Sequence, residues 1–424
     1  MITIPNPTFQ CLFDFHSVGQ GLFYSGRINQ LRFVYDCGSN SGRQYLDKAI
    51  NQYTDRYGSE QLSLLIVSHF HLDHINGINQ LLSKTGGAEE VVLPYLFPEE
   101  RLMVAAGYAI DQGLDTLDDD YIAFLADPTG FFGTSENINR LTVLRPGNIA
   151  ERQETAADQQ PGIYGWLPDE AMPLSEFPEL ATHANHNKIT IRSHHSVLRV
   201  PQWGFKFYCQ PGRATREDIV RELGALTQPI TVDDIPRVLS DRLADLKDVY
   251  YSLFGGTAGQ NSTSIVCCHG PAVPRGRRIR IELDLKFGGT IGSNFLDCLL
   301  QRSFYCDGFV WVDGSTSSPF LLPPMTLLTG DVNLKLSEFE AHFNDELQGI
   351  GLTALAHHGS EHNFRRDFPS VMPNCRCWVV SFGLGNKYRH PSKSVIDHLT
   401  DQDLTLLQCN ESQGVSFTLE GRIS

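Results

Sequence analysis

The chain has 424 residues, of which 41% are hydrophobic, so it is long enough for one large domain with added segments or for two domains. Its formal net charge of −15 argues against general adhesion to nucleic acid, which depends on clustered lysines and arginines. No apolar run reaches the roughly 18 residues of a membrane-spanning helix, so we expect no membrane partner. The N-terminus does not resemble a signal peptide, and the ten cysteines lack zinc-ribbon spacing. We therefore expect a cytoplasmic protein with reduced thiols.

The first predicted elements are two strands over residues 8–37, joined by the glycine-rich stretch Val18-Gly19-Gln20-Gly21. The two glycines permit tight turns that bring the backbone close to another segment. The second strand ends in Asp36-Cys37-Gly38. A helix over residues 42–56 and a buried strand over residues 62–67 are expected next.

Three histidines and an aspartate lie within six residues directly after this strand, in the sequence His69-Phe70-His71-Leu72-Asp73-His74. Imidazole nitrogens and a carboxylate on a short loop at a strand end are the ligands that a transition-metal site needs. A polar loop that happens to be rich in histidine is the alternative. Four potential ligands at this spacing favour the metal site.

Residues 85–258 are less regular, and we expect them to form a large, partly helical insertion that acts as a lid or docks a partner. Thr231 can cap a helix here, with Asp233 and Asp234 near its positive end. The helix prediction depends on apolar residues that recur at helical spacing, namely Ile235, Val238, Leu239, Leu243, Leu246 and Tyr250.

Strand-rich sequence returns in residues 259–424, which we expect to complete the domain begun by residues 1–84. Three of its strands release potential metal ligands at their C-terminal ends: residues 325–328 lead to Asp331, residues 352–356 to His357-His358, and residues 377–381 toward His390. A basic stretch, residues 275–280, predicts either an anion-binding strip or a solvated hairpin edge.

The combined residues suit a dinuclear hydrolytic site, in which two divalent ions about 3.5–4 Å apart share a bridging carboxylate and an activated hydroxide. Asp331 is the expected bridge. In the loop from His69 to His74, here called the metal loop, the first two histidines would bind one ion. The Asp73-His74 pair would bind the other. One of His357 and His358 would complete the first ion and His390 the second, with zinc or manganese as the metal. The candidate ligands are His69, His71, Asp73, His74, Asp331, His357, His358 and His390.

The loop from His69 to His74 matches the HxHxDH signature of the metallo-β-lactamase fold. More narrowly, other segments resemble the hydrolase domain of the ComEC family of bacterial DNA-uptake proteins. The similarity covers residues 8–80 and roughly 260–421. It implies an α/β fold, a four-layer αβ/βα sandwich with the metal site at one edge, and that Asp36 supports the metal loop without itself binding metal. The segments that carry the resemblance are Val18-Gly19-Gln20-Gly21, Asp36-Cys37-Gly38, Leu327-Leu328-Thr329-Gly330-Asp331, His357-His358-Gly359-Ser360, His390-Pro391 and Gln413-Gly414-Val415-Ser416-Phe417.

Three departures from that family stand out. No membrane channel is present, the stretch between the metal loop and Asn261 is far longer than the compact family needs, and the fold's usual third-motif histidine has no obvious counterpart before Asp331. We expect His357 or His358 to take that role. The histidines that lie in the interval are His183, His186, His194, His195 and His269.

The leading hypothesis is a metal-dependent phosphodiesterase, in particular a nuclease, whose substrate is a nucleic acid or a small nucleotide. Asp73 and His358 would act in catalysis. Lys387, Tyr388 and Arg389 lie in the loop that carries the last predicted ligand, where the first two would be catalytic through contact with a phosphate. A solvated loop is the alternative for these three residues.

Two other functions stay open at this stage. A hydrolase of a small acyl substrate, such as a lactone or a thioester, would use the same metal chemistry. The other is an effector subunit of an antiviral defence or stress system, controlled by a protein partner that binds residues 85–258.

Overall fold

The computed structural model describes residues 8–133, 137–147, 165–167, 171–181, 188–224, 230–255, 263–272, 279–288, 309–312, 325–335 and 339–423. Most of the basic stretch, residues 275–278, lies outside these ranges, as do the histidines at 183 and 186.

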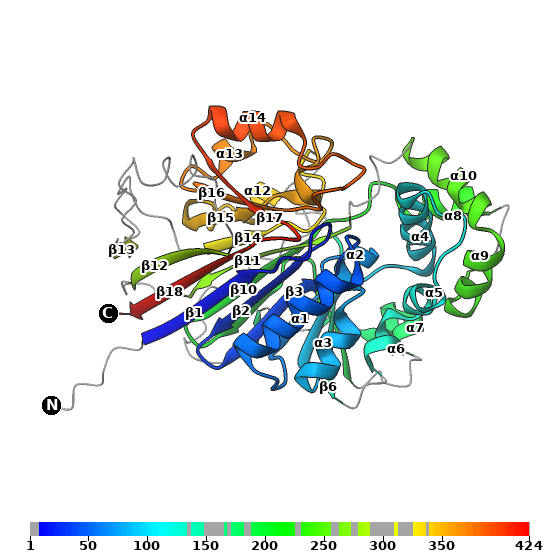
Figure 1. Cartoon of the computed structure of the whole chain (residues 1–424). Coiled ribbons are helices and arrows are strands. Elements are labelled where there is room, and N and C mark those ends of the chain that lie inside the picture. The colour runs from blue at the N-terminus through cyan, green and yellow to red at the C-terminus, as the bar shows by residue number, and fades with distance from the viewer. Residues whose placement is uncertain are drawn as a thin grey trace.

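Two large mixed sheets pack face to face (Figure 1). The first contains, in spatial order, β13 (Phe309–Val312), β12 (Ile279–Gly288), β18 (Gly414–Ile423), β1 (Thr8–Phe15), β2 (Phe23–Ile28), β3 (Leu31–Cys37), β4 (Leu64–Ile66), β5 (Ala88–Pro94), β6 (Ile138–Arg145) and β8 (Ile189–Ser193). The second contains β17 (Thr405–Cys409), β16 (Cys377–Ser381), β15 (Ile350–Ala354), β14 (Met325–Leu328), β11 (Ile265–Pro271), β10 (Trp203–Cys209), β9 (Val197–Val200) and β7 (Gly165–Leu167).

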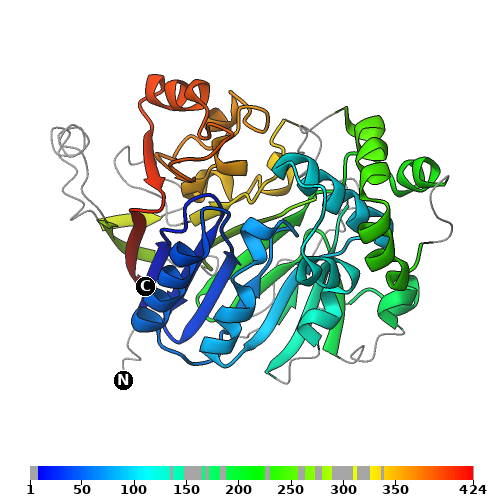
Figure 2. The same ribbon diagram turned by 45° about the vertical axis from the view of Figure 1, so that its right-hand side comes forward.

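Helices cover the outer faces of both sheets (Figures 1 and 2). Those on the first sheet include α1 and α3, those on the second are α12, α13 and α14, and a further group gathers beside the metal loop. The α-helices are α1 (Arg43–Tyr57), α2 (Leu72–Ile75), α3 (Ile78–Thr85), α4 (Pro98–Gln112), α5 (Asp119–Ala126), α6 (Pro128–Gly133), α7 (Pro178–Ala181), α8 (Arg216–Leu223), α9 (Ile235–Asp241), α10 (Leu243–Phe254), α12 (Phe339–His342), α13 (Phe368–Val371) and α14 (Lys393–Asp401). The short 3-10 helices are η2 (Leu174–Glu176), η4 (Val232–Asp234), η6 (Leu347–Gly349) and η7 (Ala356–Gly359).

Three buried clusters fill the three interfaces of a four-layer sandwich. Because successive side chains of a strand point to opposite faces, each strand serves two interfaces. In β4, Leu64 and Ile66 pack between the sheets, whereas Leu65 packs under the helices of the first sheet. In β16, Val379 packs between the sheets and Val380 under the helices of the second. The predicted αβ/βα sandwich is confirmed.

The expected insertion of residues 85–258 needs a correction. Strands β5, β6 and β8 extend the first sheet, and β7, β9 and β10 extend the second, so much of this segment is part of the sandwich. Strands β7, β8 and β9 have only three to five residues, so they show little periodicity. Strands β5, β6 and β10 have seven or eight residues, and the prediction overlooked them. Its helices α4, α5, α8, α9 and α10 pack together beside the metal loop.

The helix predicted after Thr231 is present but divided. Thr231 and Asp234 form a capping box, in which the Thr231 hydroxyl donates to Asp234 Oδ2 at 2.8 Å. The 3-10 turn η4 leads into α9, and α10 begins after a break at Arg242. All six apolar residues of the predicted helical face are buried.

Two expectations from composition can be compared with the described residues. The eight cysteines among them are all free and buried. None of the described helices combines the length and apolar character that crossing a membrane requires.

Parallel strands bring the polar loops to one edge of the sandwich. In the first sheet β3 pairs in parallel with β4, and in the second β14, β15 and β16 are parallel neighbours. The carboxyl ends of parallel strands meet at one edge, where functional loops commonly lie. Asp36 is the last residue but one of β3, Asp331 follows β14, the His357-His358 pair follows β15, and Ser381 ends β16.

Candidate metal centre

The metal loop is buried although it is polar. Strand β4 ends at Ile66, and helix α2 begins at Leu72 directly after His71. The exposed fractions of His69, His71, Asp73 and His74 are 4%, 7%, 7% and 1%. Buried polar side chains need partners, so the position of each ring has to be explained by a hydrogen bond or a ligand.

Glycines explain why the loop can be covered so closely. A Cβ on Gly38 would lie 2.4 Å from the carbonyl carbon of Asp73 and 2.5 Å from the amide nitrogen of His74. A Cβ on Gly21, which has φ +144°, would lie 2.6 Å from the Asp73 carbonyl oxygen. The Leu22 N–H donates to that same oxygen at 3.1 Å. The two glycine-containing motifs near the N-terminus therefore form a backbone seat for the metal loop.

Asp36 orients the loop through a short hydrogen-bond network. Its Oδ1 accepts the Ser68 N–H at 2.7 Å, and its Oδ2 accepts the Ser68 hydroxyl at 2.6 Å and His74 Nδ1–H at 2.7 Å. The Ser68 Oγ also lies 2.9 Å from His69 Nδ1. With Nδ1 engaged in both rings, the Nε2 atoms of His69 and His74 are left to face the centre.

The second half of the centre depends on unusual backbone. His357 and His358 have φ values of 49° and 54°, in the left-handed region that non-glycine residues rarely adopt. This turn brings both neighbouring rings toward the centre. His358 Nδ1–H donates to the Ser381 carbonyl oxygen at 2.8 Å, which leaves its Nε2 to face inward. Asp36 and Arg389, at φ 58° each, are also left-handed.

Two groups of side chains could hold a metal ion, with ligand atoms within 4.8 Å of one another. One consists of His69, His74 and Asp331, and the other of Asp73, His74 and His358. All five residues are buried. Asp73 Oδ2 lies 3.4 Å from His358 Nε2. The groups share His74, so they are two parts of one centre.

Asp331 belongs to the first group and is joined to the second through His74, which both groups share. Its Oδ1 lies 3.4 Å from His74 Nε2, and its Oδ2 lies 3.5 Å from His69 Nε2 and 3.8 Å from His357 Nε2. The Nε2 atoms of His69, His74 and His358 are buried without a hydrogen-bond partner within the described protein. Three converging unpartnered nitrogens beside two carboxylates fit a divalent transition metal well.

Electrostatics favour positive charge at this point. Burial, together with the neighbouring His74, lowers the pKa of His69, and burial beside His69 lowers the pKa of His71 to about 3. Both rings are therefore neutral, as metal ligands must be. Burial opposes protonation of His74, but Asp331 and Asp36 overcome it and raise its pKa. Carboxylates that attract a proton here would also attract a metal cation.

The predicted partition of ligands between two ions differs from the geometry. His358 lies with Asp73 and His74, the side expected for His390, whereas His357 lies on the side of His69. The His390 ring is 5.8 Å from that of His357 and joins neither group of potential ligands. The left-handed turn after β15 directs both neighbouring histidines inward, whereas His390 lies in the separate loop after β16.

The remaining loop ligand, His71, lies at the edge of the centre. Its ring is 4.9 Å from that of His69 and 5.5 Å from that of Tyr108 in α4. It joins neither of the two groups that could hold a metal. Its position beside α4 makes it the point where the centre meets the helical part of the molecule.

Tyr388 is held by α4 and does not point freely to the centre. Its hydroxyl accepts Gln112 Nε2–H at 2.6 Å and donates to the Asp111 carbonyl oxygen at 3.2 Å. The Tyr388 ring stacks on His390 at 5.7 Å, and the Lys387 ammonium lies 5.0 Å above the Tyr388 ring. The loop therefore offers an exposed cation, while its tyrosine joins the loop to α4.

The other described histidines of the middle segment lie away from the centre. His269 is buried between the sheets, where its Nε2 meets the Tyr24 hydroxyl at 3.0 Å and its Nδ1 accepts Trp203 Nε1–H at 3.3 Å. His194 and His195 follow β8 and contact each other. None of the three takes the role of the third-motif histidine.

Part of the chain resembles a known protein family. Residues 27–147 match the family model of the Metallo-beta-lactamase superfamily. The matched residues run from β2 to just beyond β6 and include the metal loop. Members of this superfamily are generally hydrolytic enzymes. It agrees with the fold class predicted from the loop motif. No curated protein sequence matches the chain.

Solved structures that resemble the chain are distant from it. The metallo-beta-lactamase fold protein YhfI from Bacillus subtilis aligns with a TM-score of 0.34 and 8% identity, over 96% of this chain and 98% of its own. A long form RNase Z from yeast aligns with a TM-score of 0.34 and 9% identity, over 96% of this chain and 41% of its own. A mutant of the CmlA beta-hydroxylase aligns with a TM-score of 0.33 and 9% identity, over 99% and 54%. Similarity at this level says nothing of the activity.

Sequence reasoning missed several residues around the centre. Ser68 was visible only as the residue before the motif, and its bonding depends on Asp36, 32 residues earlier. Ser381 acts through its carbonyl oxygen, which any residue could supply. Tyr108 and Asp111 lie on α4, and no motif marks them. Only the position of Ser381 at a strand end was a usable signal.

Proposed function

We propose that this protein is a metal-dependent hydrolase that binds two divalent ions, zinc or manganese, and cleaves phosphodiesters. The observation that carries the proposal is the position of Asp331, whose two oxygens face different histidines. Oδ1 lies 3.4 Å from His74 Nε2, and Oδ2 lies 3.5 Å from His69 Nε2. A carboxylate in this position suits a bridge between two ions.

The side chains near Asp331 form two overlapping groups. Asp73 and His358 lie together, His357 lies on the side of His69, and His74 belongs to both groups. Bound divalent ions would supply Lewis acidity, which makes water a better nucleophile and stabilises charge on a phosphoester. The protein holds the rings in fixed orientations through Asp36 and the Ser381 carbonyl, and it keeps the donors out of bulk water.

Exposed cations support a phosphodiester as the substrate. Lys387 and Arg389 flank Tyr388, whose ring stacks on His390, and Arg213 approaches from the other side of the metal loop. Local positive charge of this kind in a chain of net charge −15 suits a small anionic substrate better than a long nucleic acid. Because the Tyr388 hydroxyl already has partners, we assign it the role of holding the loop.

One observation favours a second candidate. Phe70 and Leu96 line a pocket beside His69, and an apolar wall next to a metal centre also suits a small acyl substrate such as a lactone or a thioester. Control by a protein partner that binds residues 85–258 stays a prediction.

Elemental analysis combined with a substrate panel tests the proposal. The panel contains single-stranded DNA, double-stranded DNA, RNA, cyclic dinucleotides and an acyl ester, each assayed with added manganese or zinc. We expect about two ions per chain and cleavage of a phosphodiester that Asp73→Ala abolishes. Cleavage of the acyl ester alone by highly purified protein would refute the phosphodiester assignment.

A further inference from the structure

The loops that follow β14, β15 and β16 carry an excess of positive charge. They form a rim beside the metal centre, made of residues 329–335, 355–367 and 382–392. The rim has five lysines and arginines against three acidic residues, whereas the whole chain has 34 against 49. Four exposed cations of the rim form no ion pair with a carboxylate in the described part of the chain, namely Lys335, Arg366, Lys387 and Arg389. The rim therefore offers uncompensated positive charge in an acidic protein.

Hydrogen bonds hold the three loops of the rim against one another. Lys335 Nζ–H donates to the Glu361 carbonyl oxygen at 2.8 Å, and the Glu361 N–H donates to Ser392 Oγ at 3.1 Å. Strands β14, β15 and β16 are parallel neighbours, so the first and last loops start roughly 10 Å apart. Arg366 lies farther out, where its carbonyl oxygen is 2.7 Å from His398 Nε2 in α14. The other three cations are thus spread along the rim and not gathered at one point.

The last loop of the rim is shaped so that its cations lie next to the metal centre. Arg389 has φ 58°, a left-handed conformation that a residue other than glycine keeps only where its surroundings hold it. Asn386 supplies that support, since its Oδ1 accepts the His390 N–H at 2.9 Å and its Nδ2–H donates to the His390 carbonyl oxygen at 2.7 Å. Lys387 and Arg389 flank Tyr388, whose ring stacks on His390.

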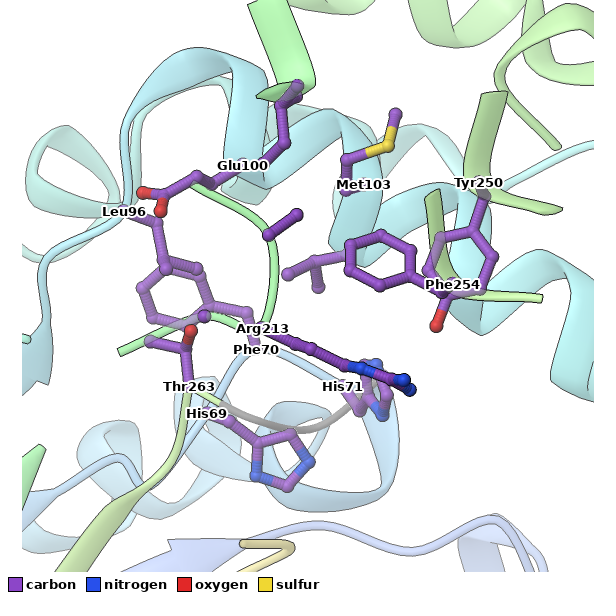
Figure 3. A pocket seen from close by; sticks show the side chains of 14 residues that line it. His69, Phe70, His71, Leu96, Glu100, Met103, Arg213, Tyr250, Phe254 and Thr263 are labelled. Atoms are coloured by element: carbon purple, nitrogen blue, oxygen red, sulfur yellow. The ribbon is translucent and has the colours of Figure 1, made fainter. Parts of the chain in front are cut away.

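The other side of the centre leaves little room for a substrate to extend. Buried side chains that include Phe70, Leu96 and Met103 pack beside the metal loop (Figure 3). They leave a space of about 40 Å³ next to His69 and His71. That space is enough for roughly three water-sized groups. A substrate larger than its reacting group would therefore extend over the rim.

We infer that the rim binds a second phosphate of the substrate, next along its chain to the phosphate at the metal centre. The inference rests on the proposed function, because it takes the reacting group to be a phosphodiester. The chemical class that fits is a short chain of phosphodiesters, in which each link carries one negative charge. Since the cations from Lys335 to Arg389 cover only about two strand spacings, a few phosphates are enough to occupy them.

The salt dependence of binding to the metal-loaded, full-length protein tests the inference. Fluorescence anisotropy follows labelled thymidine oligomers whose phosphorothioate links resist cleavage, and a dimer with one link is compared with a pentamer with four. The logarithm of the affinity of a single strand falls against the logarithm of salt concentration with a slope of about −0.7 for each phosphate neutralised. We expect a slope of about −0.7 for the dimer and about −2 for the pentamer. Equal slopes would overturn the inference.

Variants on the rim separate charge from packing. Lys335→Gln keeps a donor for the Glu361 carbonyl oxygen but loses the charge, so the slope for the pentamer should become less steep by about 0.7. Lys335→Arg keeps the charge and should retain the wild-type slope. Glu361→Gln removes a negative charge from the rim and should tighten binding of the pentamer about twofold. Lys84→Gln, at an exposed position of α3, is the control and should change neither value. A slope that Lys335→Gln leaves unchanged would remove Lys335 from the site.

Cleavage of bis(p-nitrophenyl) phosphate tests the proposed function separately, because this substrate has a single phosphate and does not need the rim. If the protein cleaves it but binds the dimer and the pentamer with equal slopes, the proposed function stands and the second phosphate site falls. If the pentamer shows the steeper slope and no phosphodiester is cleaved, the site on the rim stands and the hydrolytic assignment falls.

Discussion

The two halves of the metal centre are held in place by different means. In the early half, side chains hold side chains: Asp36 accepts hydrogen bonds from Ser68 and His74, and Ser68 also meets His69. The residues concerned lie within 39 positions of the chain, from 36 to 74. Asp36 lies in β3, and the others follow its parallel neighbour β4.

The late half is held mainly by backbone. His358 donates to the carbonyl oxygen of Ser381, the His357 N–H donates to the Gly330 carbonyl at 3.1 Å, and both histidines have positive φ values. Asn386 shapes the next loop, where its side-chain amide donates to the His390 carbonyl at 2.7 Å. The identity of a few side chains thus determines the early half, whereas the path of the chain determines the late half. Asp331 is where the two meet.

The largest effect is expected at that meeting point. Asp331→Ala removes a carboxylate that faces histidines on both sides, so it should abolish tight binding of both ions. It should also lower kcat/KM by more than roughly 100-fold, which is the cost of losing a residue that only hydrogen-bonds to a metal ligand. Metal content measured by elemental analysis checks the first effect. Asp345→Ala, at an exposed position, is the control. Two tightly bound ions in Asp331→Ala would show that Asp331 does not connect the two halves of the centre.

The neighbouring histidines of the late half should differ from each other. His358 is 5% exposed and lies 3.4 Å from Asp73, whereas the side chain of His357 is 22% exposed and lies 3.8 Å from Asp331. We therefore expect His358→Ala to weaken metal binding by about 100-fold and His357→Ala by about tenfold. Competition with a chelator measures both values, with His398→Ala as the control. Equal losses of metal affinity would mean that the two histidines contribute equally to metal binding.

A pair of serine variants tests the contrast between the halves directly. Ser68→Ala removes the hydroxyl that links Asp36 to His69 and should weaken metal binding by about tenfold. Ser381→Ala retains the carbonyl oxygen that holds His358 and loses hydroxyl contacts away from the metal ligands, including a bond of 3.2 Å to the Gly19 carbonyl oxygen, so it should change metal affinity less than about twofold. If Ser381→Ala proved as damaging as Ser68→Ala, side chains would hold the late half too.

The same contrast explains what the sequence could predict. The loop from His69 to His74 is contiguous, and its spacing alone predicted the fold correctly and indicated a metal site. Asp331 and the His357-His358 pair could be found because each follows an apolar strand. The turn could not be predicted: His358 groups with Asp73 and His74 rather than with the first two histidines, because the left-handed turn at 357 and 358 leaves no trace in residue type.

The middle segment shows the same limit in the fold. Its helical stretch was found because six apolar residues recur at helical spacing, and all of them are buried. Strand β10 carried a usable signal, because Trp203, Phe205, Phe207 and Cys209 alternate and pack between the sheets. The short β7 and β9 have too few residues to show a period. Which sheet each strand joins is a tertiary property that no local pattern contains.

The smallest effect is expected where the late half meets the helical side. Tyr388→Phe removes the hydroxyl that binds Gln112 and the Asp111 carbonyl. The free energy of interaction between this loop and α4 should therefore weaken by about 1 kcal/mol. We expect KM to rise about threefold to fivefold while kcat changes less than about twofold, because the ring and its stacking on His390 remain. Tyr251→Phe, at a position that is 49% exposed, is the control for steady-state kinetics. A drop in kcat of about 100-fold with KM unchanged would instead identify the hydroxyl as a participant in the reaction, since general acid or base groups contribute on that scale. The late half would then hold a reacting group as well as the backbone that positions it.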